Sequence, residues 1–212
     1  MPKKKVKKNK KELKKEGVDP KELIKSENKT LRNFLIAIAV FVVFIVVFFV
    51  VSNSAKNFEY KGVEFEMVQE GELLLYRTDI PVIYQEREMD YNFYLRNDPR
   101  ELDKIPFEGN LELAPLLALS SAEDFNCDGF GIIAIANLIN LYKISGIDVV
   151  RDENATCDPE GRFAFINLQQ GDETSIEKVG PSCYEVNINN CEILEATERL
   201  MLESFVEIDK LR

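Results

Sequence analysis

The sequence predicts an α+β protein, in which one N-terminal transmembrane helix is followed by a domain with a mixed, mostly antiparallel sheet and two main helices. Three observations support this prediction. The chain of 212 residues contains an unbroken run of eighteen apolar residues, Phe34–Val51. After that run, segments with strand-like alternation come first, and two segments with helical spacing are interleaved with further strands. All four cysteines follow the run, which is typical of a disulfide-bonded domain.

Charge divides the chain in the same way. Residues 1–33 hold 13 Lys/Arg and 5 Asp/Glu, a net charge of +8, and residues 52–212 hold 14 and 32, a net charge of −18. We therefore expect a basic tail over 1–33, a transmembrane helix over 34–51, a spacer over 52–57 and a domain over 58–212. The chain has no histidine, which excludes Ser-His-Asp triads, histidine-ligated zinc and histidine pH switches.

The apolar run predicts an uncleaved signal-anchor in the cell membrane. It contains no charge, Gly or Pro, and as a helix it is about 27 Å long, close to the ~30 Å hydrocarbon core. A buried core element and a signal peptide cleaved after Ser54 are the alternatives, but the run exceeds the usual apolar length of a signal peptide. The excess of basic residues before it predicts a single-pass topology, with the N-terminus in the cytoplasm and the C-terminal domain outside.

The lysine-rich tail is too charged to fold, except where Asp19, Pro20 and Glu22 have the pattern of a helix start. We expect it to set topology and to attract anionic lipid headgroups at the bilayer. No aromatic residue is interleaved among the lysines, so nucleic acid is not an expected partner.

Within the domain, the pattern predicts strands and two helices in a definite order. Helical spacing predicts a buried helix over 129–144 and a second helix over 192–207. Pro81 suggests an edge strand, and the last three strands are expected to form a meander. The buried face of the first helix is expected to hold Ile132, Ile133, Ala136, Ile139 and Asn140, with Leu138 and Leu141 widening the apolar stripe. The predicted strands cover residues 63–67, 73–76, 80–84, 91–96, 147–150, 163–168, 175–178 and 183–188.

Four external cysteines predict two disulfides. A metal site is disfavoured because no C-x-x-C pair and no histidine is present. If Cys183–Ile188 is a strand, its far end lies roughly 17 Å from Cys183, and two residues cannot bring Cys191 back. The predicted pairs are therefore Cys157–Cys183 and Cys127–Cys191.

Two further segments have the pattern of a binding site. Asp124–Gly129 matches the first half of a calcium loop, but its twelfth position is Ile135 where a glutamate belongs, so we expect Asp128 or Asn126 to cap the following helix instead. Arg96–Arg100 could hold an anion between two guanidinium groups, but Asp98 and Pro99 are more typical of a capped turn.

Catalytic patterns are scarce. A Ser-Lys dyad could join Ser120 or Ser121 to Lys104, and carboxylate pairs are abundant without one that stands out. Asn154 lies in an N-glycosylation sequon on the expected outer side, whereas the sequon at Asn28 is cytoplasmic by topology. We therefore predict no catalytic residue, no cofactor and no metal ion.

Several short stretches carry a resemblance to a known group of proteins. They are 93–100, 134–138 after Cys127, 183–184 and 190–194. Together they resemble uncharacterised single-anchor membrane proteins predicted from archaeal genomes. The resemblance implies a location at an archaeal cell surface and implies no activity.

The sequence thus favours a membrane-anchored extracytoplasmic module that binds an unknown protein partner or serves in envelope assembly without catalysis. One alternative is a membrane-tethered hydrolase using carboxylates or Ser-Lys. The other is a receptor for a small cationic solute, because an acidic surface concentrates cations.

Overall fold

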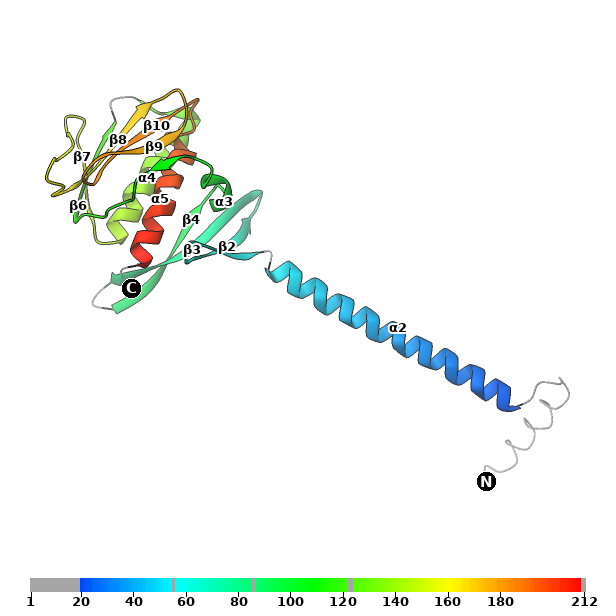
Figure 1. The fold of residues 1–212 in the computed structure, drawn as a ribbon. Helices are drawn as coiled ribbons and strands as arrows, with labels where there is room; N and C mark the ends of the chain where they lie inside the picture. The colour runs from blue at the N-terminus through cyan, green and yellow to red at the C-terminus, as the bar shows by residue number, and fades with distance from the viewer. Residues whose placement is uncertain (1–19, 55, 85–86, 122–123, 211–212) are drawn as a thin grey trace. The chain divides into compact units, whose positions relative to one another are not determined.

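The computed structural model describes residues 20–54, 56–84, 87–121 and 124–210, and it divides the chain into two compact units, 1–55 and 56–212 (Figure 1). Each unit is described here by itself. The predicted N-cap Asp19 lies outside the described residues.

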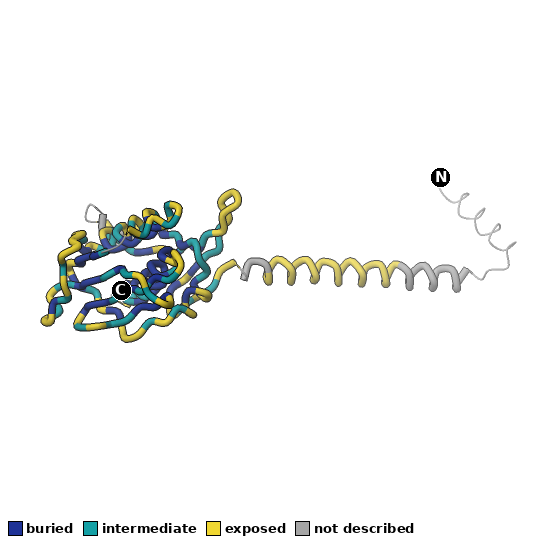
Figure 2. Tube along the Cα trace, turned by 90° about the horizontal axis from the view of Figure 1, so that it is seen from above, coloured by how far each residue is buried: buried dark blue, intermediate teal, exposed yellow. Residues whose placement is uncertain are grey.

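The first unit contains one long helix, α2 (Pro20–Ser54), which begins at the proline expected to start it. Its segment Leu31–Val51 has a mean hydropathy of 3.6 and is long and apolar enough to cross a membrane. None of that segment is buried against protein, as Figure 2 shows along its length. A free apolar surface of this extent is what a lipid-facing helix requires.

The second unit contains two sheets and two main helices, so the predicted α+β class is confirmed. The sequence pattern did not separate the strands into two sheets. Sheet A is antiparallel and has the order β1-β2-β3-β4, and sheet B is mixed and has the order β5-β9-β10-β8-β6-β7. The strands are β1 (Asn57–Tyr60), β2 (Val63–Glu70), β3 (Leu73–Tyr84), β4 (Arg87–Leu95), β5 (Phe107–Glu108), β6 (Leu116–Ser121), β7 (Asp148–Arg151), β8 (Ala164–Gln170), β9 (Ser175–Gly180) and β10 (Cys183–Ile188). The helices are α3 (Pro99–Leu102), η1 (Cys127–Gly129), α4 (Phe130–Ile144) and α5 (Ile193–Asp209).

Strand β3 joins two segments that the pattern predicts as separate strands. Its pairing with β2 ends at Arg77, and from there to Tyr84 it pairs with β4 alone. Pro81 lies in this one-sided part, where a residue without an N–H is tolerated. Pro81 therefore does lie in an edge position, but in one half of a strand that is longer than predicted.

The meander predicted for β8, β9 and β10 is wrong. β9 and β10 are antiparallel neighbours, but β8 pairs with β10, and in parallel. β6 is parallel to both β8 and β7. Four parallel strands therefore end at the same edge of sheet B, which is where α/β folds gather their functional loops.

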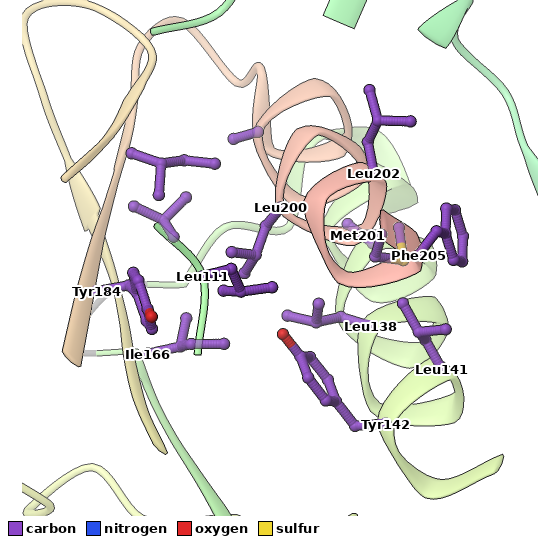
Figure 3. Packing of buried hydrophobic residues seen from close by; sticks show 14 of the residues in the cluster. Leu111, Leu138, Leu141, Tyr142, Ile166, Tyr184, Leu200, Met201, Leu202 and Phe205 are labelled. Carbon is purple, nitrogen blue, oxygen red and sulfur yellow. The ribbon is translucent and has the colours of Figure 1, made fainter. Parts of the chain in front are cut away.

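The core lies around α4 and α5, which pack side by side, and α5 also contacts both sheets. Figure 3 shows Leu138, Leu141 and Tyr142 of α4 on the side that faces Leu200 and Met201 of α5. The Tyr142 hydroxyl lies 3.0 Å from Ser204 Oγ, so the buried phenol keeps a hydrogen bond. Burial raises the pKa of Tyr142 to about 12.

The predicted buried face of α4 is right at Leu138 and Leu141 and wrong at other positions. Ala134, Leu138 and Leu141 are fully buried, whereas Ile132 is 69% exposed, and Ala136 and Asn140 are exposed as well. The helix is apolar almost all round, so its spacing fits more than one face. Contact with α5 decides which residues are fully buried, whereas Ile133 and Ile139 are only partly buried against the core.

Candidate docking surface on helix α4

The outward face of α4 carries an apolar stripe, formed by Ile132, Ile135, Ala136 and Ile139. These positions follow the i, i+3, i+4, i+7 spacing, so they form one continuous ridge. Ile132 and Ala136 are exposed, and Ile135 and Ile139 are half-buried. A stripe of this spacing normally covers a hydrophobic core. Here Ile135 and Ile139 pack against the core with part of their surface, and Ile132 and Ala136 are left exposed.

A groove runs beside the stripe, between α4 and the segments that follow β6 and β7. Its volume is about 770 Å³, and a second hollow of about 400 Å³ adjoins it at Ile135 and Arg151. The groove, called here the α4 groove, is lined by Ser121, Asp124, Phe125, Asn126, Gly131, Ile132, Ile135, Ala136, Ile139, Arg151 and Glu153. Its position at the carboxyl ends of parallel strands matches the usual place of binding sites in such sheets.

The wall of the groove is held tightly against the first turn of α4. A Cβ on Gly131 would lie 1.5 Å from the backbone oxygen of Phe125, so only glycine allows this approach. The N–H of Gly131 also donates to the carbonyl oxygen of Asn126 at 3.3 Å. This packing fixes the segment that carries Phe125 as one side of the groove.

The turn before α4 is strained and covalently fastened. Cys127 and Asp128 have φ of 44° and 55°, values that non-glycine residues rarely adopt, and Gly129 follows at 90°. A disulfide joins Cys127 to Cys191, with the Cα atoms 5.5 Å apart. The second disulfide joins Cys157 to Cys183 at 5.7 Å. This is the pairing that the sequence predicts.

The segment predicted as a half calcium loop has a different role. The residue before α4 is Gly129, and no side chain caps the helix, so neither Asp128 nor Asn126 acts as the expected cap. Among the described residues, no three Asp, Glu, Cys or His side chains are grouped to hold a metal ion. The segment instead forms the wall of the α4 groove.

Three charged side chains at the α4 groove have no partner among the residues that the structure describes. In the described part of the chain, Asp124, Arg151 and Glu153 make no side-chain hydrogen bond or ion pair. Their contribution to the groove is two negative charges against one positive charge. Unpaired charges at the edge of an apolar surface are suited to recognising a charged partner.

The segment Arg96–Arg100 forms the capped turn that its pattern favours, and this turn joins β4 to α3. Asp98 caps α3 by accepting from Arg100 N, and the Arg100 guanidinium, hydrogen-bonded to that carboxylate, lowers the pKa of Asp98. The Arg100 guanidinium also lies 4.5 Å from the ring centroid of Phe58. Since Arg100 is already paired, the two arginines do not form an anion clamp.

Glu198 of α5 binds this turn, and it was not among the residues singled out from the sequence. Its carboxylate is fully buried and accepts three hydrogen bonds, from Arg96 N at 2.8 Å and from Asn97 N and Nδ2 at 2.9 Å. Burial raises the pKa of Glu198 to about 7, against the effect of these hydrogen bonds. The only sequence signal was a glutamate within an otherwise buried helix.

The structure does not assemble the other predicted candidates into a catalytic site. Ser120 Oγ donates to the backbone oxygen of Glu153 at 3.5 Å, and Lys104 pairs with Glu101, so no Ser-Lys dyad involving Ser120 forms. Asn154 is exposed, and its sequon is therefore accessible to modification.

Another hollow, with a volume of about 1030 Å³, lies on sheet A. Its lining includes Glu59, Glu64 and Asp79, which are exposed, and Glu66, which pairs with Arg77 at 2.7 Å. Exposed carboxylates remain solvated, so this hollow is an acidic surface without the buried polar contacts of a ligand site.

No protein-family model, curated protein or solved structure matches the chain.

Proposed function

We propose that the protein is a single-pass membrane protein whose domain binds a protein partner outside the cell, without catalysis, through the apolar stripe of α4. The observation that carries this proposal is the exposure of that stripe beside the α4 groove. Monomeric domains rarely leave a continuous apolar ridge in water, and such ridges mark interaction sites.

The orientation is supported by charge and by the disulfides. Thirteen basic residues precede the apolar run Phe34–Val51, which favours a cytoplasmic tail. Two disulfides favour an oxidising compartment for residues 56–212. The tail would then lie against the anionic headgroups of the inner leaflet.

Protease added to sealed cells tests this orientation. The domain should be digested, and an epitope tag at the N-terminus should be protected. Protection of the domain and digestion of the tag would reverse the proposed topology.

Site-specific photo-cross-linking tests the docking surface. A photoreactive amino acid replaces Ile132 in the full-length chain in its native membrane, and the matched control places it at Val179, an exposed valine of β9. Position 132 should give one heavier adduct, which the additional substitution Ile139→Asp should abolish.

The same experiment has outcomes that contradict the proposal. If positions 132 and 179 give the same adducts, or if Ile139→Asp leaves the adduct unchanged, α4 is not the contact surface. An adduct of twice the chain's mass would show that the partner is a second copy of this protein and not a different protein.

A further inference from the structure

Resting on the proposed function, we infer that the partner segment is a basic amphipathic helix that lies along α4, with its apolar residues in the α4 groove and its basic residues beside Asp124 and Glu153.

The surface has the shape that a helix recognises. Its apolar residues are spaced at i, i+3, i+4 and i+7, the spacing by which a partner helix presents its own anchors. Ala136 lies in the middle of the stripe, where a small side chain lets a second backbone come close. The groove beside it, about 770 Å³, offers room for large aliphatic side chains.

The charge at the surface determines the sign of the partner. Asp124 and Glu153 border the groove without a partner in the described part of the domain, and Arg151 supplies the only positive charge among the groove residues. The domain as a whole carries −18 over residues 52–212. Lysine or arginine on the flanks of the incoming helix would therefore be attracted from a distance and paired on contact.

The same charge disfavours two other occupants of an exposed apolar stripe. A second copy would bring two strongly acidic domains together, and like charges in contact are repelled. An anionic lipid surface would be repelled for the same reason. A basic polypeptide is the occupant that gains from both the apolar stripe and the charges beside it.

Three synthetic helical peptides test this inference against the full-length protein in nanodiscs of zwitterionic lipid. The first carries leucines at i, i+3, i+4 and i+7 with lysines elsewhere. The second has glutamates in place of the lysines, and the third is a scrambled form of the first. Fluorescence anisotropy measures binding, and empty nanodiscs give the background to subtract.

Of the three peptides, only the basic striped peptide should show saturable binding. This binding should weaken when salt is raised from about 0.05 M to about 0.5 M. Ile132→Asp should weaken that binding about tenfold or more, because it removes a large apolar contact. Val179→Asp, the matched control, should leave it unchanged. Both variants add the same negative charge, so a loss confined to Ile132→Asp cannot arise from charge alone.

Other results overturn the inference. Equal or tighter binding of the acidic peptide would refute the charge argument, and equal binding of the scrambled peptide would reduce the effect to adsorption on an acidic surface. Self-association of the protein that Ile132→Asp abolishes would assign the stripe to a second copy. A stripe-dependent heterologous cross-link in cells, together with failure of the basic peptide, would leave the proposed function intact and refute only this inference.

Discussion

Replacing Glu198 by glutamine should change how the stability of the domain depends on pH. Burial raises the pKa of Glu198 from 4.5 to about 7 in the folded protein. At 1.36 kcal/mol per pKa unit, this difference corresponds to about 3 kcal/mol. Because the side chain is fully buried, solvent screening does not reduce this figure greatly.

The direction follows from the raised pKa. The folded protein holds the proton more tightly than the unfolded chain, so this stabilising contribution is complete below about pH 4.5. It is lost as the pH rises through about 7. Glutamine does not titrate, so the unfolding free energy of the wild type minus that of E198Q should fall by about 3 kcal/mol over this range.

Hydrogen bonding determines how much more stable the wild type is than E198Q at low pH, before that difference in unfolding free energy begins to fall. The amide of glutamine has one acceptor oxygen, whereas the Glu198 carboxyl group faces N–H donors from Arg96 and Asn97 at both oxygens. One buried N–H would lose its acceptor in E198Q, at a cost of roughly 1–3 kcal/mol. E198Q should therefore be clearly less stable than the wild type at pH 4.5.

Urea unfolding between pH 4.5 and pH 8 measures the difference in a common detergent, followed by tyrosine fluorescence. All seven tyrosines lie in the domain and the chain has no tryptophan, so the signal reports the domain alone. Glu108→Gln at an exposed position of β5 is the matched control and should leave stability nearly unchanged. A difference that is flat, or that grows as the pH rises, would refute the reasoning and show that the three N–H donors outweigh burial.

Three further predictions concern the disulfides and the local packing. A mild dithiol should reduce the Cys127–Cys191 bond before the Cys157–Cys183 bond, because Cys191 is exposed and Cys183 is fully buried. Differential alkylation and mass spectrometry measure the order of reduction, and the reverse order would contradict the prediction. Gly131→Ala should destabilise the domain by about 3 kcal/mol through its clash with Phe125, and thermal unfolding should show a smaller loss for the control Gly71→Ala, where no atom lies within 4 Å. The Arg162 side chain lowers the pKa of Asp158 to about 2, so this carboxylate should stabilise the domain above about pH 3.8 and lose that effect as the pH falls through 2; acid titration of Asp158→Asn should lack this component.

The disulfide pairing could be predicted because it depends on one local fact. Cys183 begins a strand and Cys191 follows its end, so the two cannot meet. That argument holds whether the neighbouring strand is parallel or antiparallel. The pairing was therefore right although the meander was wrong: parallel β8 and β10 also bring the segment before β8 and the start of β10 to one end of sheet B.

The candidate site could not be predicted in the same way. Ile132, Ala136 and Ile139 of the apolar stripe were identified from their helical spacing, and Ile135 was not. Because α4 is apolar on nearly every face, spacing alone does not say which face is covered. That choice depends on α5, whose contact with Leu138 and Leu141 is made across more than fifty residues of sequence. Charge gave little help either: Asp124 lies six residues before α4 in the sequence, but Glu153 comes near the helix only through the parallel pairing of β6 and β7.

The nested disulfides have a mechanical consequence. The Cys127–Cys191 bond encloses α4 and all strands from β7 to β10, and the Cys157–Cys183 bond lies inside the same loop. The Cys127–Cys191 bond keeps the two ends of that loop joined under a pull between the N-terminal end of the domain and a partner held on α4. Sheet A has no such bond, and its strands pair in sequence order, so tension would separate them one after another. The four strands of sheet A would then lengthen under tension, while the surface that binds the partner keeps its shape.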